Sequence, residues 1–483
     1  MKKSLTPQFP SGIARVLRSG RKLGIQQGDR HQYNRIRFSA RKGKPSASTS
    51  EEYPNGLAEE LKMGLDSASF EERMRARREG RRGGPILIPD DAETEEEYFQ
   101  GATCKVFIDR NGEFREGLCC DYGFRKGTQR MYEDGMDGQI PASAWELGMA
   151  NFKQEFTALR CSFRYNEYKS MRAKAPLPRG LAEIDNAVGS AIVGAFAWAD
   201  KKLEELGALG RLPEDPEAKA EQELAKSCVN FRSKLDQMVL SNDAVWEREK
   251  KRDEIRGPNF TPPYVRVVYL ALCYFLDFYF NNRPIQRFWF LESVARMPYF
   301  SYITMLHLYE SLGWWRAGAK LRKVHFAEEW NELHHLMIME SLGGDRYWMD
   351  RFMAGHASIF YYVVLCILFF FNPKLAYNFS ELIEGHAVDT YGEFVDANEE
   401  LLKSMPPPYV ALNYYLGSDL YLFDTFQTYY MSKAEQRRPE CTSLYDVFSN
   451  VRDDEGQHVE TMAACQDARI VKDFESMDQN LKY

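Results

Sequence analysis

The hydrophobic pattern of the chain changes at the segment GPNFTPPYV, residues 257–265. From there to about residue 472, long apolar and aromatic segments follow one another, interrupted by Gly-Gly, Asn-Pro and Pro-Pro-Pro breaks. The pattern predicts helices at about 264–281, 284–315, 318–342, 346–371, 374–404 and 444–465, with 409–430 partly helical. Pro298 lies inside the second of these helices and predicts a kink there.

The part of the chain before this change has a different character. Residues 51–100 are rich in Glu and Arg and predict a solvated, charged linker. The segment CKVFIDRNGEFREG, which begins at Cys104, predicts two short strands joined at an Asn-Gly turn, whereas 144–250 is helix-prone. We therefore interpret 101–258 as an N-terminal extension of uncertain α/β character, in which no motif indicates a function. The chain as a whole is predicted to be mainly α, with 473–483 as a C-terminal tail.

The first fifty residues carry many Lys, Arg and Ser but a single acidic residue, Asp29, and they lack the apolar core of a secretory signal. Such a composition is typical of organelle transit peptides. Residues 1–50 are therefore predicted to be a transit peptide and are excluded from the fold. A disordered basic arm is the alternative that the composition leaves open.

Composition narrows the classes of function. The net charge of −7 and the pI near 5.8 argue against a nucleic-acid-binding protein, which usually presents a basic face. At 483 residues with 44% hydrophobic content, the chain is long enough for more than one domain and a sizeable core. Its nine cysteines form no CxxC pair, so we expect reduced thiols rather than a disulfide framework or a zinc ribbon.

Two Glu-x-x-His motifs stand out in the C-terminal half. Glu332 precedes His335 in EEWNELHHLMIME, Glu455 precedes His458 in NVRDDEGQH, and these are the only two such pairs in the sequence. Residues three apart on a helix lie about 60° apart and project from nearly the same face. Each pair can therefore present a carboxylate and an imidazole to one metal ion. A surface Glu/His pair is the alternative for either motif alone.

A dinuclear carboxylate site also needs one glutamate from each of two other helices. Glu292 in RFWFLESVARM and Glu384 in SELIEGHAVDTY lie in apolar context on separate predicted helices. Four carboxylates and two imidazoles suit two iron ions that cycle between ferrous and ferric states. The sequence thus predicts a ferritin-like four-helix di-iron bundle within 259–472. Four other histidines are expected to pack or hydrogen-bond instead: His334 and His386 because they follow a glutamate by only two residues, and His307 and His325 because they lie too far along their helices.

Longer segments of the C-terminal half resemble a known family. They are RFWFLESVARMPYF, LHLYESLGWWRAGAKLRKVHFAEEWNELHHLMIMESLGG, GSDLYLFDTFQT and LYDVFSNVRDDEGQHVETMAACQ. Over about 284–468 the sequence closely resembles the alternative oxidase family, in particular its plastid, plastoquinol-oxidising branch. The resemblance implies a monotopic di-iron enzyme that oxidises quinol and reduces O2 to water without pumping protons. It also implies a homodimer.

The resemblance assigns roles to single residues. It places the iron ligands on the same six residues, and it gives catalytic roles to Tyr391 and to Asp454, the latter by orienting a ligand imidazole. Plain core packing is the alternative for Tyr391. Arg287 would hydrogen-bond a quinone oxygen, and its alternative is a side chain that reaches toward lipid headgroups. The complete quinol pocket of the family maps onto Arg287, Leu291, Ala387 and Thr390.

One apolar stretch is a candidate membrane segment. AGHASIFYYVVLCILFFF, residues 354–371, is about long enough to cross a bilayer. The resemblance implies instead an interfacial helix that lies in one leaflet, with 266–281 and 288–303 contributing to the same apolar surface. The segment SDLYLFDTFQTYYMSKAEQRRPE, residues 418–440, favours the plastid branch over the mitochondrial one. The expected location is therefore the chloroplast thylakoid membrane.

Other functions stay open on the sequence alone. A mitochondrial ubiquinol oxidase would share the six metal-binding residues. A di-iron hydroxylase or acyl desaturase uses similar Glu-x-x-His pairs but needs a channel for an organic substrate. A non-enzymatic interaction protein would use the helical domain only to anchor 101–258 to a membrane.

Overall fold

The fold is described from a computed structural model. It covers residues 105–108, 114–117, 122, 143–165, 167–174, 179–212, 226–257, 261–315, 319–416 and 440–467. All of these residues belong to Met74–Tyr483, the second of the two units into which the chain divides. The predicted transit peptide, linker and C-terminal tail lie outside the described residues, as does 418–439.

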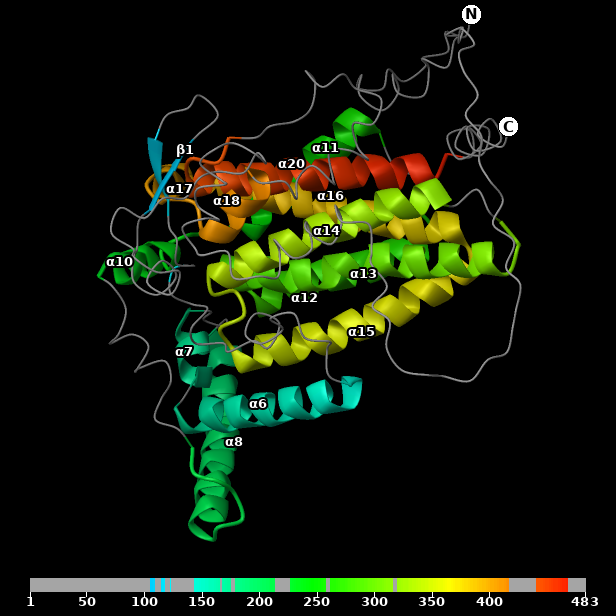
Figure 1. The fold of residues 1–483 in the computed structure, drawn as a ribbon. Coiled ribbons are helices and arrows are strands. Elements are labelled where there is room, and N and C mark those ends of the chain that lie inside the picture. The colour runs from blue at the N-terminus through cyan, green and yellow to red at the C-terminus, as the bar shows by residue number, and fades with distance from the viewer. Residues whose placement is uncertain are drawn as a thin grey trace, which may run out of the picture. The chain divides into compact units, whose positions relative to one another are not determined.

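The C-terminal half is a bundle of long α-helices (Figure 1). In chain order they are α12 (Pro263–Tyr279), α13 (Pro284–Ser311), α14 (Ala319–Ser341), α15 (Trp348–Phe371), α16 (Pro373–Ala397), α17 (Glu399–Lys403), α18 (Tyr409–Tyr415) and α20 (Leu444–Cys465). Helix α13 packs along α14, α16 packs along α20, and α15 lies against α13. The mainly α prediction is confirmed, although the helix expected at 374–404 breaks at Asn398 into α16 and α17.

Local sequence determines where these helices begin and how they turn. Proline occupies the first position of α12, α13 and α16, where its missing N–H would have no partner within the helix. Ser443 and Asp446 form a capping box at the start of α20. Between α14 and α15 the backbone turns through Gly343, whose φ of 79° favours glycine. A Cβ on the adjacent Gly344 would lie 2.3 Å from the Cβ of Trp289, so a larger residue does not fit there.

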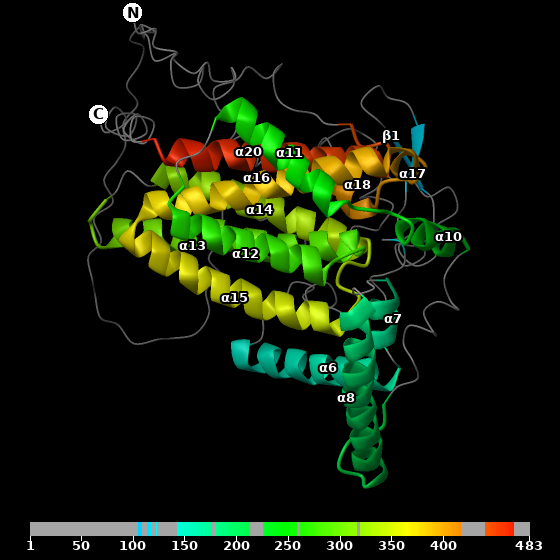
Figure 2. The same cartoon turned by 180° about the vertical axis from the view of Figure 1, so that it is seen from behind.

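The N-terminal extension is mixed, as its sequence indicates. Strands β1 (Lys105–Ile108) and β2 (Phe114–Gly117) pair antiparallel, in agreement with the predicted strand pair. Its helices are α6 (Ala144–Arg164), α7 (Glu167–Lys174), α8 (Arg179–Glu205), α10 (Lys226–Leu235) and α11 (Asn242–Arg256). Helix α6 contacts α15, where Arg351 Nε lies 3.2 Å from Glu155 Oε1. Helix α11 packs on α16, and Figure 2 shows it crossing the bundle.

Helices α12 and α15 present exposed apolar faces. Among the described residues, α15 is the one helix long and apolar enough to cross a membrane, judged by length and composition. Its Ile359 and Phe360 are 70% and 72% exposed, and Val267 on α12 is 65% exposed. Helix α13 differs, because eight of the sixteen residues in 288–303 are buried, seven are half-buried and only Phe300 is exposed. The eight buried residues therefore do not join the exposed apolar surface, and a contribution from the exposed and half-buried residues of 288–303 stays a prediction.

Candidate metal centre

The six predicted metal-binding residues converge in the middle of the bundle, and each is at most 2% exposed. They are Glu292 on α13, Glu332 and His335 on α14, Glu384 on α16, and Glu455 and His458 on α20. They form two groups, each with one ligand atom per residue and these atoms within 4.8 Å of one another. Glu332 and Glu455 belong to both groups, so two metal ions would share their carboxylates. Each ion would gain one further glutamate and one histidine.

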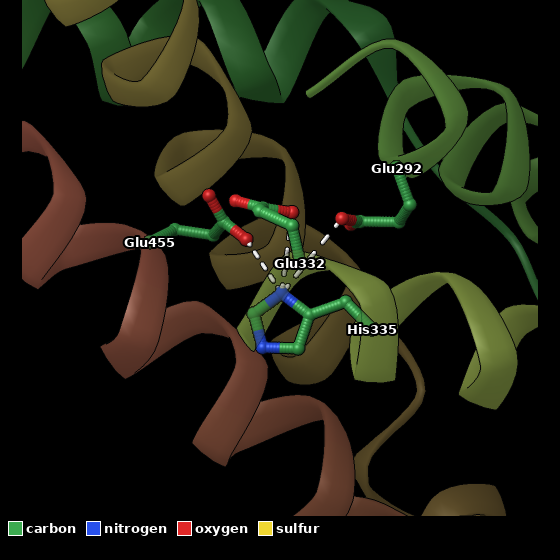
Figure 3. Close-up of side chains that lie close together, drawn as sticks. All are labelled: Glu292, Glu332, His335 and Glu455. Carbon is green, nitrogen blue, oxygen red and sulfur yellow. Dashed lines mark ion pairs between the residues drawn. The ribbon is translucent and has the colours of Figure 1, made fainter. Parts of the chain in front are cut away.

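In the first group, the imidazole of His335 faces three carboxylates (Figure 3). Its Nδ1 lies 3.0 Å from Glu455 Oε1, 3.6 Å from Glu332 Oε2 and 3.7 Å from Glu292 Oε2. In the second group, His458 Nδ1 lies 2.8 Å from Glu332 Oε1 and 3.5 Å from Glu455 Oε2. Both imidazoles thus direct Nδ1 toward the two shared glutamates.

The residues fit a dinuclear metal centre on two counts. First, several buried atoms of the cluster form no hydrogen bond: Glu292 Oε2, His335 Nδ1, and both carboxylate oxygens of Glu332 and of Glu455. Buried polar groups are nearly always hydrogen-bonded, so such lone pairs are typical of metal ligands. Second, four buried carboxylates meet only two imidazoles, and two divalent cations would balance their negative charge.

Burial and mutual repulsion set the protonation of the glutamates. Burial, with the charges of Glu332 and Glu455 nearby, raises the pKa of Glu292 well above its ordinary value. Burial, with the same two charges, likewise raises the pKa of Glu384. Burial opposes ionisation of Glu332 too, but contacts with His335 and His458 outweigh it and lower the Glu332 pKa. Of Glu292, Glu332 and Glu384, Glu332 is therefore the one held in its charged form.

Asp454 lies directly beside the metal-binding residues. Its Oδ2 contacts His335 Nε2 at 3.1 Å and accepts hydrogen bonds from Asn331 Nδ2 at 3.1 Å and Tyr415 Oη at 3.0 Å. An ionised carboxylate only accepts, so in the metal-bound chain the His335 proton would reside on Nε2 and the lone pair of Nδ1 would face the metal. Fixing the tautomer in this way is the usual function of a carboxylate behind a metal-binding histidine.

Two tyrosines form hydrogen bonds with the glutamates that are not shared between the two groups, Glu292 and Glu384. The Tyr391 hydroxyl donates a hydrogen bond to Glu292 Oε1. The Tyr299 hydroxyl donates one to Glu384 Oε1 at 2.8 Å, and the Tyr299 ring lies 5.3 Å from that of His458. Tyr299 is not among the site residues predicted from the sequence. The signal was present, because Tyr299 follows Glu292 by seven residues, as Tyr391 follows Glu384.

The other histidines in the described part of the chain lie outside both groups. His325 contacts Glu328 Oε2 through Nδ1 at 3.0 Å and the Tyr377 hydroxyl through Nε2 at 3.1 Å. His334 Nδ1 lies 2.7 Å from a backbone carbonyl one turn earlier, and His307 contacts a serine on its own helix. His386 contacts Arg287 instead of a metal-binding residue.

The four residues predicted to bind quinol lie on α13 and α16 beside the centre. Arg287 is 1% exposed and donates to Asp277 Oδ1 at 2.9 Å, so the alternative of a side chain reaching toward lipid headgroups is wrong. Thr390 is buried and its Oγ1 donates to the backbone carbonyl of His386 at 2.7 Å. Leu291 and Ala387 are half-buried.

The fold and the site define a helical bundle with a buried cluster of glutamates and histidines, in which each of two groups could hold a metal ion. Residues 266–467 match the family described as Alternative oxidase. Ubiquinol oxidase 4, chloroplastic/chromoplastic, of Arabidopsis thaliana is 52% identical over 191 residues, which are 40% of this chain and 54% of that protein.

Other relatives are more distant. The mitochondrial ubiquinol oxidase of Mangifera indica is 26% identical over 195 residues, 40% of this chain and 54% of that protein. The ubiquinol oxidase of Trachipleistophora hominis is 25% identical over 221 residues, 44% of this chain and 61% of that protein. The chain thus spans about half the length of the Arabidopsis thaliana and Mangifera indica relatives. No solved structure matches it.

Proposed function

We propose that the chain is a plastoquinol oxidase, which passes electrons from quinol to O2 at a non-haem di-iron centre and forms water without pumping protons. The proposal is carried by the two groups that share Glu332 and Glu455, in the part of the chain that matches the alternative oxidase family. Relatives named ubiquinol oxidase support the reaction class. Identity of 52% with a chloroplastic relative, against 26% with a mitochondrial one, supports plastoquinol and a plastid location.

In this proposal two iron ions per chain lie between the shared glutamates. Glu292 and His335 complete one iron site, and Glu384 and His458 complete the other. Bound iron supplies the electron-transfer and O2 chemistry of the reaction. Glutamates suit this centre because a carboxylate oxygen binds both ferrous and ferric iron.

The surrounding residues orient the ligands and keep the site dry. Asp454 holds the His335 ring with Nδ1 toward the metal, and Tyr391 donates its hydroxyl proton in a hydrogen bond to Glu292. Tyr391 is fully buried, and its ring stacks on Phe288 at 4.2 Å. Phe394 and Phe448 pack against Phe288 and close this side to water. Tyr391 is thus close enough to the reacting atoms to exchange a proton or an electron with them.

Quinol reaches the site from the membrane in this proposal. Arg287, Leu291, Ala387 and Thr390 bind the quinol ring, and the exposed apolar faces of α12 and α15 lie in one leaflet of the thylakoid membrane. The charged metal-binding residues lie in the bundle behind these helices, which favours an interfacial α15 over a membrane span. A homodimer and removal of residues 1–50 as a transit peptide belong to the same proposal.

Oxygen uptake tests the proposed reaction directly. We expect the purified, iron-loaded full chain to consume O2 when given a plastoquinol analogue, and to do so in the presence of cyanide. Glu332→Gln should abolish uptake and lower the iron content, whereas Glu400→Gln, at an exposed position on α17, should leave both unchanged. Two bound irons per chain without quinol-dependent uptake would favour the hydroxylase or desaturase alternative, and absence of bound iron would exclude the oxidase.

A further inference from the structure

Helix α11 lies before the part of the chain that matches the family, yet it packs against the predicted quinol-binding residues. Three of its residues, Asn242, Trp246 and Glu249, are spaced four and three apart and so share one helical face. That face is directed at α12, α13 and α16, as the contacts of these three side chains show.

The packing of α11 on α16 is specific. Arg252 Nε donates to Asp389 Oδ2 at 2.8 Å, and Arg248 Nε donates to Glu393 Oε2 at 3.0 Å. A Cβ on Gly385 would lie 2.9 Å from Arg252 Nη1, so this glycine leaves room for the guanidinium. Charge pairing and close approach together fix α11 at one position along α16.

Asn242 and Asp277 determine the orientation of the Arg287 guanidinium. Its Nη1 donates to Asn242 Oδ1 at 2.7 Å and to Asp277 Oδ1 at 2.9 Å. The indole N–H of Trp246 donates to the second oxygen of Asp277 at 2.9 Å. Two residues of α11 thus hold Arg287, one directly and one through its carboxylate partner. Of the guanidinium nitrogens, Nε forms no hydrogen bond although it is buried.

Glu249 determines the orientation of the His386 imidazole. Its Oε2 lies 3.1 Å from His386 Nδ1 and accepts a hydrogen bond from the Tyr269 hydroxyl at 2.6 Å. On its other side the imidazole meets Arg287, with Nε2 at 3.2 Å from Nη2. Since Arg287 only donates, His386 accepts through Nε2 and donates from Nδ1 to Glu249. The rings of Trp246 and His386 lie 5.4 Å apart.

We propose that α11 is a wall of the quinol site, and that Asn242 and Glu249 position Arg287 and His386 so that the buried Nε–H of Arg287 can bind an oxygen of the quinol ring. The inference rests on the proposed quinol oxidation and deepens it. It assigns a function to part of the N-terminal extension, in which no sequence motif indicates one. Both α11 residues are positioning residues, since they act through Arg287 and His386.

The test compares variants of the iron-loaded full chain. Asn242→Ala and Glu249→Ala should each raise KM for decyl-plastoquinol about tenfold, the effect of a lost hydrogen bond to a charged group, while kcat stays within about twofold. Asn242→Asp keeps an oxygen acceptor for Arg287 and should restore KM. Glu247→Ala, at an exposed position of the same helix, is the matched control and should behave as the wild type.

Direct binding separates this inference from the proposed reaction. Calorimetric titration with decyl-plastoquinone should show Kd raised by about the same factor in Asn242→Ala and Glu249→Ala, with iron content unchanged. Unchanged Kd and KM would overturn the inference, as would a parallel loss of iron and kcat with KM intact, which indicates only a structural role. If the wild type consumes no O2 but Kd responds to these variants, the proposed oxidation fails and the binding site stands.

Discussion

The hydroxyl of Tyr299 on α13 donates a 2.8 Å hydrogen bond to Glu384 on α16. The reciprocal bond runs from Tyr391 on α16 to Glu292 on α13. Each tyrosine follows a glutamate of its own helix by seven residues, which is two turns along one face. Because the two helices run antiparallel, the register that pairs one tyrosine with the opposite glutamate also pairs the other. The two glutamates that are not shared are therefore held by equivalent bonds.

Tyr299→Phe should weaken one half of the metal centre. The substitution removes the donor to Glu384 Oε1, so this carboxylate can rotate and bind its metal less firmly. We expect the affinity for the second metal ion to fall about tenfold, with kcat reduced by a similar factor. Competition with a chelator measures the affinity, and Mössbauer spectra of the iron-loaded chain should show a change at one of two iron sites.

Tyr302→Phe is the matched control for this change. Tyr302 lies on the same helix and is equally buried, but its hydroxyl contacts Ser380 and a backbone carbonyl instead of a glutamate of the centre. Loss of the Tyr302 hydroxyl should lower the free energy of unfolding by on the order of 1 kcal/mol and leave the Mössbauer spectrum unaltered. If both variants give the wild-type spectrum, Tyr299 serves only packing.

Asp454→Asn should disturb the other histidine. An asparagine that turns its amide N–H₂ toward His335 Nε2 would favour the tautomer with the proton on Nδ1, where the metal binds. We expect metal affinity to fall about 10- to 100-fold. Asp453→Asn, at the exposed neighbouring position, should have no effect on chelator competition. Equal affinity in both variants would contradict a role for Asp454 in fixing the tautomer.

The convergence of the two Glu-x-x-His pairs could be anticipated because the geometry within each pair is local, whereas Glu292 and Glu384 were chosen from their apolar context on separate helices. The helical repeat puts Glu332 beside His335 and Glu455 beside His458 whatever the rest of the chain does. The ends of the helices could also be predicted, since Pro, Gly and capping residues act within one turn of the helix. The prediction of α20 at 444–465 matches the structure to the residue.

The missed features depend on how distant segments pack. Finding Tyr299 required the antiparallel register of α13 and α16, which no single helix encodes. The contact of α11 with Arg287 joins residues 45 apart, and its contact with His386 joins residues 137 apart. The burial of Arg287 follows from the same packing, because Asn242 and Asp277 supply the partners that a guanidinium needs away from water.

The metal-free chain should lose stability as pH rises. Burial and neighbouring carboxylates raise the pKa of Glu292 and Glu384 above 4.5, while carboxylate contacts outweigh burial and raise the pKa of His335 and His458 above 6.5. A raised pKa means that the folded state binds the proton more tightly. The stabilisation is complete at a pH below the pKa that the group has in the unfolded state. It is lost as the pH increases through the pKa that the group has in the folded state. The lowered pKa of Glu332 affects the stability only below about pH 4.5, so it does not alter the decrease in stability expected at higher pH.

Thermal unfolding measures this effect. Between about pH 6 and pH 8.5, Tm of the metal-free chain should fall, whereas Tm of the metal-loaded chain should stay higher because metal replaces the protons. The gap between the two values should therefore widen with pH. A metal-free Tm that increases across this range would contradict the assigned pKa directions.

Membrane binding should depend on the exposed face of α15. Ile359 and Phe360 are both more than two-thirds exposed, so replacing them by Asp leaves the core intact but puts charge where lipid would lie. Burial of such a side chain contributes about 1.5–3 kcal/mol, so the double variant should bind vesicles of plastid-type anionic lipid and galactolipid at least tenfold more weakly. Flotation of the full chain measures this binding.

Leu206→Asp changes an equally exposed apolar residue outside α12 and α15 and should float as the wild type does. If the α15 variant floats unchanged, the interfacial surface lies elsewhere, and quinol must then reach Arg287 by a route that does not cross this face.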